Sequence, residues 1–334
     1  MPDSRDSYFG GDDLVDAHSR KRAIVWLSVG SNSGLVLVKL LVGFHIGAVS
    51  VISEAMHSAV DLLAAIIVLV AVRSAEKPAD DEHPFGHAKL ENISGAIEAL
   101  LIFAAAGWII YEAVLKLLHP EHLDHLGWGV GVMLFSALVN LLVSNRLRTV
   151  GQQVGSIALQ ADAVHLRTDV YTSAGVMVGL TLMLLLRALG GGDQRWIDPV
   201  AAIVVALLIV RTAYDLYLQT SRDLLDASLP KEEAAWIQDY LTRLYPTVHG
   251  FHKLRTRKSG DVRFVEFHLI VERNMSIEET HRISEVMECD IEARFPGSSV
   301  TIHVEPCDGI CKPVCAAGCL LSAEEREAVR KGTG

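Results

Sequence analysis

Charged residues are scarce in this chain of 334 residues. Lys, Arg, Asp and Glu together make up 21% of the sequence, while half of the residues are hydrophobic. The mean hydropathy of +0.31 is too high for an ordinary soluble domain of this length. The composition therefore excludes an ordinary soluble protein and indicates a polytopic membrane protein.

A surplus of basic residues is also missing, because the formal net charge is -10 and the isoelectric point lies near 5.8. Nucleic-acid binding needs a concentrated basic surface, so we expect no nucleic-acid partner. A cleavage-site pattern after a short apolar segment is lacking near the N-terminus as well. We therefore expect the first membrane helix to act as its own uncleaved insertion signal.

Cysteine is absent from the first 288 residues. Cys289 stands alone, and four more crowd the C-terminal tail at a strict four-residue period: Cys307, Cys311, Cys315 and Cys319. This distribution is unlike the disulfide framework of a small secreted fold and favours a reducing compartment. The tail thiols either bind Zn²⁺ or Cu⁺ or remain idle, and the sequence supports both interpretations equally. Glycines and Pro313 within the run argue against a regular helix.

Six hydrophobic segments each come close to the roughly 20 apolar residues that a membrane-spanning helix needs. The predicted spans are residues 23–44, 48–73, 90–117, 127–146, 156–187 and 198–218. Basic residues concentrate before the first span and after the second and fourth spans. Because basic loops stay in the cytoplasm, this asymmetry predicts a multi-pass membrane protein with both termini cytoplasmic.

The composition changes to that of a soluble domain after Asp226. Helical periodicity and strand-like alternation predict a small α+β domain of the order α-β-β-α-β. The expected elements are helices 231–244 and 276–295 and strands 252–257, 263–271 and 299–304. The chain then divides into a cytoplasmic N-terminal tail (1–22), a transmembrane domain (23–222), a cytoplasmic soluble domain (223–306) and a Cys-containing tail (307–334). We expect little fixed structure in the last part beyond a short frayed helix at 324–331.

Two of the predicted spans carry a His-x-x-x-Asp pair, His57 with Asp61 and His165 with Asp169. Residues four apart on a helix lie one turn apart on the same face. Intramembrane ionisable groups are expensive and are functional by default, so we expect the two pairs to face each other. The alternative is a structural hydrogen bond between packed helices. The third span adds Glu91, Glu98 and Glu112, and the fourth adds Asn140.

Two neutral imidazoles and two carboxylates suit a tetrahedral divalent ion, with Zn²⁺ the best match and Co²⁺, Fe²⁺, Cd²⁺ or Mn²⁺ also compatible. Four protein ligands leave no open coordination position, which counts against a metal-dependent membrane enzyme. A membrane sensor or scaffold that binds metal without moving it remains an alternative. Asp162 is either an entrance ligand or a helix-end partner for a basic residue, and we favour the second.

Further histidines cluster outside the spans. Asp80, His83 and His87 offer a second donor set in a loop, where Pro84 and Gly86 favour a turn over a helix; the alternative is a solvated loop without function. The soluble domain offers a third set that suits one or two ions across a dimer interface, or else consists of scattered surface histidines: His252, His268, His281, His303 and Glu305. His119, His122 and His125 form either a weak outer site or plain solvated residues, and we expect His249 to be a turn residue.

The paired ligands on spans two and five, the segment 80–91 (DDEHPFGHAKLE) and the histidine-bearing C-terminal domain resemble the cation diffusion facilitator family over residues 20–307. The resemblance implies a homodimeric exporter of divalent metal, driven by proton antiport through alternating access, with a metallochaperone-like soluble domain. It implies zinc as the principal metal, a metal site in the loop and the bacterial inner membrane as the location. It also implies a salt bridge between Lys89 and Asp226 that links the bundle to the soluble domain.

Overall fold

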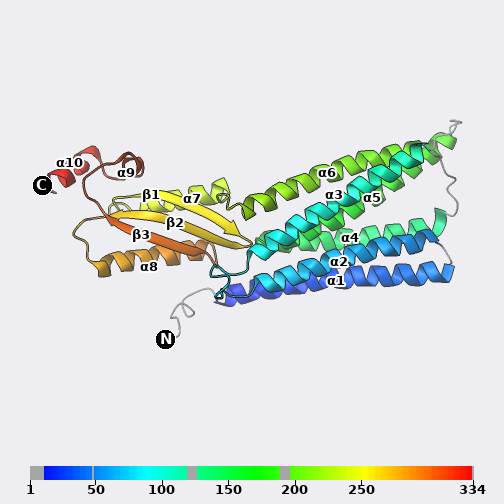
Figure 1. The fold of residues 1–334 in the computed structure, drawn as a ribbon, viewed down its shortest axis with the longest axis horizontal. Coiled ribbons are helices and arrows are strands. Elements are labelled where there is room, and N and C mark those ends of the chain that lie inside the picture. The colour runs from blue at the N-terminus through cyan, green and yellow to red at the C-terminus, as the bar shows by residue number, and fades with distance from the viewer. Residues whose placement is uncertain (1–10, 47–48, 119–125, 189–195, 333–334) are drawn as a thin grey trace. The chain divides into compact units, whose positions relative to one another are not determined.

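The structure, a computed structural model, describes residues 11–46, 49–118, 126–188 and 196–332. The chain separates into two compact units at the boundary between Leu224 and Leu225. The first unit holds the apolar helices and the second holds the sheet (Figure 1).

Six long helices run side by side in the first unit (Figure 1). They are α1 (Gly11–Ile46), α2 (Val49–Ala75), α3 (Lys89–Leu118), α4 (Leu126–Gln153), α5 (Ile157–Ala188) and α6 (Ile197–Leu224). Helix α1 begins at Gly11, so residues 11–22 of the predicted N-terminal tail are helical.

Four of these helices are long and apolar enough to cross a membrane, counting only the residues that the structure describes. Their candidate spans are Ser19–Val42, Ala55–Ala75, Lys89–Leu118 and Pro199–Leu224. Helices α4 and α5 contain 28 and 32 residues and are therefore long enough as well. Their crossing of the membrane, and with it the total of six spans, stays a prediction.

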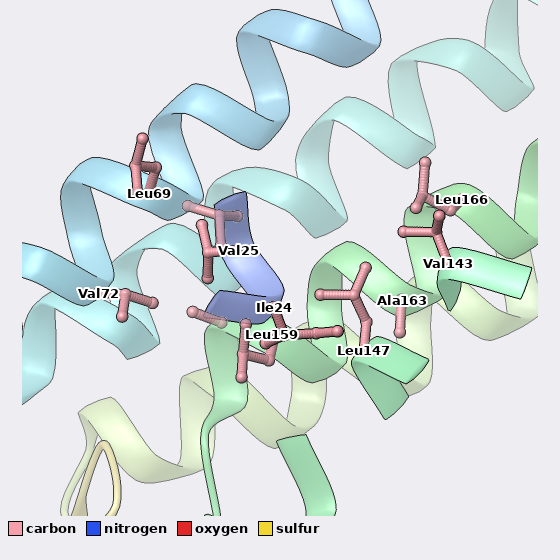
Figure 2. Close-up of a cluster of buried hydrophobic side chains, with 11 residues drawn as sticks. Ile24, Val25, Leu69, Val72, Val143, Leu147, Leu159, Ala163 and Leu166 are labelled. Carbon is pink, nitrogen blue, oxygen red and sulfur yellow. The ribbon is translucent and has the colours of Figure 1, made fainter. Parts of the chain in front are cut away.

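A cluster of buried hydrophobic side chains joins four helices of the bundle (Figure 2). It contains Ile24 and Val25 of α1, Leu69 and Val72 of α2, Val143 and Leu147 of α4, and Leu159, Ala163 and Leu166 of α5. A second cluster joins α3, α5 and α6 and is rich in alanine, which lets helix backbones approach closely. At Gly95 of α3, an added Cβ would lie 2.8 Å from a methyl group of Thr220 and 2.9 Å from one of Ile157.

The outward faces of the bundle expose large apolar side chains. Leu63, Leu100, Trp108, Leu138 and Leu208 are each more than half exposed and lie on four different helices. Such a distribution would be unfavourable in water and suits contact with lipid.

The second unit is a small α+β domain that begins with α7 (Lys231–Arg243). The chain continues through β1 (Gly250–Ser259), β2 (Val262–Val271), α8 (Ile277–Arg294) and β3 (Ser299–Pro306). The predicted order α-β-β-α-β is confirmed. The strands form one sheet in the order β1-β2-β3, in which β1 pairs antiparallel with β2 and β2 pairs parallel with β3.

The core of this domain lies between the sheet and its two helices. Val265, Phe267 and Leu269 alternate along β2 and are buried against Ile237 of α7 and Ile291 of α8. Successive side chains of a strand point to opposite faces. The even-numbered positions of β2, including His268, therefore belong to the face opposite the helices.

The C-terminal tail corrects the prediction of little fixed structure. It forms α9 (Pro313–Ala317) and α10 (Ala323–Gly332), so the expected short helix at 324–331 is confirmed. Between them, the backbone of Cys319 pairs with that of Gly250 at the start of β1. The expectation failed because it considered local propensity only, and the contacts that hold this segment come from β1.

Candidate metal sites

Helices α2 and α5 bring the two His-x-x-x-Asp pairs to one place in the bundle. Nε2 of His165 lies 3.3 Å from Oδ1 of Asp61. Nε2 of His57 lies 3.9 Å from Oδ1 of Asp61 and 3.9 Å from Oδ1 of Asp169. Donor atoms of His57, Asp61 and Asp169 all lie within 4.8 Å of one another. These distances are short enough for one small cation to draw donors from both helices.

Burial differs sharply among these four residues, which we call the bundle quartet. The side chains of Asp61 and His165 are 6% and 8% exposed, and that of Asp169 is 19% exposed. The side chain of His57 is 55% exposed in the isolated chain. A carboxylate removed from water is costly unless it is paired or binds a cation, so the buried side of the quartet favours a positive charge. The exposed imidazole of His57 lies on the side of the quartet that is accessible in the isolated chain.

Two residues on other helices contact the quartet, and no sequence pattern predicts this role for either of them. Oε2 of Glu98, on α3, lies 3.3 Å from Nδ1 of His165, and the Glu98 side chain is fully buried. The amide of Asn140, on α4, donates a hydrogen bond of 3.3 Å to Asp169. Carboxylates beside the second nitrogen of a histidine commonly fix its orientation and leave the first nitrogen free for a metal.

Asp162 lies outside this group of donors. It is 1% exposed near the start of α5, within the bundle. A different buried acid, Glu91, pairs with Lys21 at 3.0 Å and accepts a hydrogen bond from Ser156. This ion pair links α1 to α3 and to the residue before α5. The charge of Glu91 is therefore balanced by Lys21, which is not a residue of the quartet.

The loop between α2 and α3 gathers the second predicted donor set. Nδ1 of His83 and Nε2 of His87 each lie 3.4 Å from a carboxylate oxygen of Asp80. The loop is a turn, as Pro84 and Gly86 predict, and Gly86 has a φ of 79°. Asp80 also accepts hydrogen bonds from the backbone amides of His83 and Glu82, at 2.7 and 3.1 Å. The bond from His83 is the main cause that lowers the pKa of Asp80.

Three histidines align across the sheet of the C-terminal domain. His252 on β1 is paired in register with His268 on β2, and His268 is paired with His303 on β3. Glu305, two residues farther along β3, reaches all three: its carboxylate oxygens lie 2.6 Å from His268, 3.4 Å from His252 and 3.6 Å from His303. The predicted common face of His303 and Glu305 is thereby confirmed.

The protonation of this row favours metal ligands. The hydrogen bond with His268 lowers the pKa of Glu305, and burial lowers the pKa of His252. The carboxylate is therefore held ionised and the imidazole neutral, which are the forms that coordinate a metal.

His281 does not join this row within one chain. It lies near the start of α8, is 71% exposed and pairs with Glu285 at 3.3 Å. The predicted salt bridge between Lys89 and Asp226 joins residues of the two units and stays a prediction. Within its own unit, Nζ of Lys89 donates to the carbonyl of Leu224 at 3.4 Å, and Asp226 pairs with Arg257 at 3.5 Å. The predicted outer histidines at 119–125 lie outside the described residues.

The four tail cysteines are free thiols of intermediate burial around one small cavity. His249, which the sequence predicts only as a turn residue, lines the same cavity. No local pattern links His249 to the cysteines, because the turn before β1 and the tail meet only in the folded domain.

Comparison with known proteins matches the two units to two family models. The model described as the cation efflux transmembrane domain matches residues 25–225, and that described as the cytoplasmic domain of cation efflux proteins matches residues 229–307. An uncharacterized transporter of Synechocystis is 36% identical over 280 residues, which cover 84% of this chain and 88% of that protein. The cation-efflux pump FieF of Salmonella schwarzengrund is 32% identical over 275 residues, which cover 82% of this chain and 89% of the pump. A solved structure of the putative zinc transporter CzrB in its zinc form is 40% identical, with a TM-score of 0.24, and covers 25% of this chain and 96% of its own.

Proposed function

The chain belongs to the cation diffusion facilitator family of membrane transporters, and on that premise we propose that it exports Zn²⁺ across the bacterial inner membrane in exchange for protons. The bundle quartet is the transport site in this proposal. The residue types of the quartet and their close approach across α2 and α5 carry it.

The chemistry of the donors supports zinc over the lighter divalent ions. Two imidazole nitrogens and two carboxylate oxygens match the four-coordinate geometry of Zn²⁺, whereas Mg²⁺ and Ca²⁺ prefer six or more oxygen ligands. Fe²⁺, Cd²⁺, Co²⁺ and Mn²⁺ are the competing substrates.

Proton exchange follows from the protonation that coordination requires. Both imidazoles must be neutral and both carboxylates ionised to hold the ion, so binding releases protons and protonation releases the ion. In the proposed cycle the site loads from the cytoplasm, the bundle rocks to face outward, and incoming protons displace the ion.

The remaining clusters have supporting roles in the proposal. The histidine row with Glu305 binds one or two ions in a homodimer, and the exposed His281 contributes from the dimer interface. Metal at this interface tightens the dimer and biases the rocking of the bundle. The loop set of Asp80, His83 and His87 binds a further ion, and the bridge between Lys89 and Asp226 couples the two units.

Proteoliposomes test transport directly. An imposed pH gradient should drive uptake of Zn²⁺ into vesicles that carry the protein, and replacing the gradient by equal pH should stop it. His57→Ala and Asp61→Ala should abolish uptake, while His45→Ala, an exposed histidine in the last turn of α1, should retain it.

Two results would overturn the proposal. Unchanged uptake by the quartet variants would refute the assigned site. Zinc binding without gradient-driven flux would identify a membrane sensor or scaffold instead. Parallel assays with Fe²⁺, Cd²⁺, Co²⁺ and Mn²⁺ identify the preferred ion. If any of these ions is taken up faster than Zn²⁺, that ion and not Zn²⁺ is the principal substrate.

A further inference from the structure

The tail from residue 307 onward is folded around thiols, and apolar packing supplies little of its interior. Leu321 is the one large apolar side chain of this segment that is buried, counting residues 307–332. Ile310 and Val314 are 64% and 55% exposed. A segment of this size that lacks an apolar core usually needs a disulfide or a metal ion to hold its shape. The matched model of the cytoplasmic domain ends at residue 307, where the cysteine run begins.

The backbone directs the cysteines of this segment toward one place. The amide of Cys307 donates to the carbonyl of Val271, which fixes the first cysteine at the end of β3. A tight turn follows, in which Gly309 has a φ of 70°. Helix α9 starts at Pro313 and carries Cys315. The chain then returns to β1, where the amide of Phe251 donates to the carbonyl of Gly318 and the backbone of Cys319 pairs with Gly250.

The cavity between these segments has a volume of about 10 Å³. All four thiols line it, together with His249, Ile270 and Arg326. A volume of this order admits roughly one water molecule or one small ion.

His249 provides a second, independent indication of a ligand. Its Nδ1 atom is buried and has no hydrogen-bond partner among the residues that the structure describes. A buried polar atom without a partner costs free energy, so such an atom in a native protein usually has a water molecule, an ion or another ligand beside it. The imidazole therefore lies where it would contact an occupant of the thiol cavity.

We propose that Cys307, Cys311, Cys315 and Cys319 bind one Zn²⁺ ion as a structural tetrathiolate site beside His249. On binding, four thiols lose their protons to solvent and four zinc–sulfur bonds form, so no oxidant or reductant is needed. Zinc–sulfur bonds are about 2.3 Å long. No three of the four thiols lie within 4.8 Å of one another, so the ion draws residues 307–319 inward. Arg326 lines the same cavity and brings one positive charge to its wall.

Cobalt substitution in the full-length, reduced protein tests this site separately from transport. Tetrahedral cobalt thiolates have a sulfur-to-cobalt charge-transfer band, which histidine and carboxylate sites lack. We expect this band to grow to a plateau as Co²⁺ is added and to disappear when Zn²⁺ is added. Cys315→Ser and Cys319→Ser should each lose most of it. Cys289→Ser should keep it, because this thiol is exposed on α8 and outside the cavity.

Alkylation of the wild-type protein gives an answer that does not depend on the folding of a variant. Zn²⁺ should protect the four tail cysteines from iodoacetamide and leave Cys289 reactive, as peptide masses would show. The proposal is wrong if the wild type has no charge-transfer band, if the band survives in the tail variants, or if zinc protects none of the tail thiols. If Cu⁺ binds tightly and Zn²⁺ does not protect the tail thiols from alkylation, the site is a Cu⁺ site and the proposal of Zn²⁺ is also wrong. A failure of zinc transport with the band intact would affect only the proposed transport function.

Discussion

Glu98 offers the sharpest test of how the bundle quartet is oriented. Its carboxylate is fully buried and lies 3.3 Å from Nδ1 of His165, while Nε2 of the same ring faces Asp61 at 3.3 Å. Glu98→Gln keeps the shape of the side chain but removes the charge that favours a proton on Nδ1. Nδ1 is then no longer held as the protonated nitrogen, so Nε2 is no longer fixed as the nitrogen whose lone pair can bind the metal.

Partners of this kind typically contribute a factor of about 10–100 to metal affinity, which corresponds to about 1.4–2.8 kcal/mol. We therefore expect Glu98→Gln to raise the KM for Zn²⁺ uptake by about 10–100-fold. The assay is initial uptake into proteoliposomes over a range of free Zn²⁺ at a fixed pH gradient.

The matched control is Glu112→Gln on the same helix, because Glu112 is 53% exposed and pairs only with Lys116 among the ion pairs described for it. This control should leave KM unchanged within about twofold, since exposed ion pairs contribute little. Equal KM values for the two variants would refute the role of Glu98. A loss of folded protein by Glu98→Gln alone, seen in size-exclusion profiles, would assign the residue a structural role.

Three further outcomes follow from the geometry. Asp80→Asn keeps the oxygen that accepts the turn hydrogen bonds but loses the charge, so the affinity of the loop for Zn²⁺, measured by equilibrium dialysis, should fall more than about tenfold. Asp81→Asn should bind Zn²⁺ as the wild type does, and equal losses of affinity in the two variants would argue against a loop site. Glu233 is held by a bidentate pair with Arg263, at 2.7 and 2.8 Å, and this hydrogen bonding lowers its pKa. Because Glu233 binds a proton more readily in the unfolded chain than in the folded one, its contribution to stability is present above about pH 4.5 and is lost as the pH falls through the lowered pKa. Calorimetry should therefore show that the unfolding temperature falls less steeply with decreasing pH for Glu233→Gln than for Glu232→Gln, and identical slopes for the two variants would contradict this expectation. Ile291→Ala removes a fully buried side chain of α8 and should destabilise the C-terminal domain by about 2–5 kcal/mol, whereas Ile277→Ala on the same helix, 88% exposed, should have little effect on its unfolding temperature.

Local patterns were sufficient for much of the C-terminal domain. The helix predicted at 231–244 is α7, and the strands predicted at 263–271 and 299–304 fall within β2 and β3. Each of these elements has an apolar period of its own, so its type can be recognised without knowledge of its neighbours. The tail could not be predicted in this way, because its fold depends on backbone pairing with β1 and on capping contacts such as that between Ser322 and Glu325.

By itself, the sequence determined the membrane character of the chain and the pairing of His57 with Asp61 and of His165 with Asp169 on single helix faces. Both follow from composition and from the period of the helix, which are properties of short segments. The tertiary structure alone decided that Glu98 and Asn140 meet the bundle quartet, that three histidines share one row of the sheet, and that His249 lies among the tail thiols. These contacts join segments far apart in the chain, and they depend on helix packing and strand register. A shift of one residue in that register would turn the histidine row to the other face of the sheet.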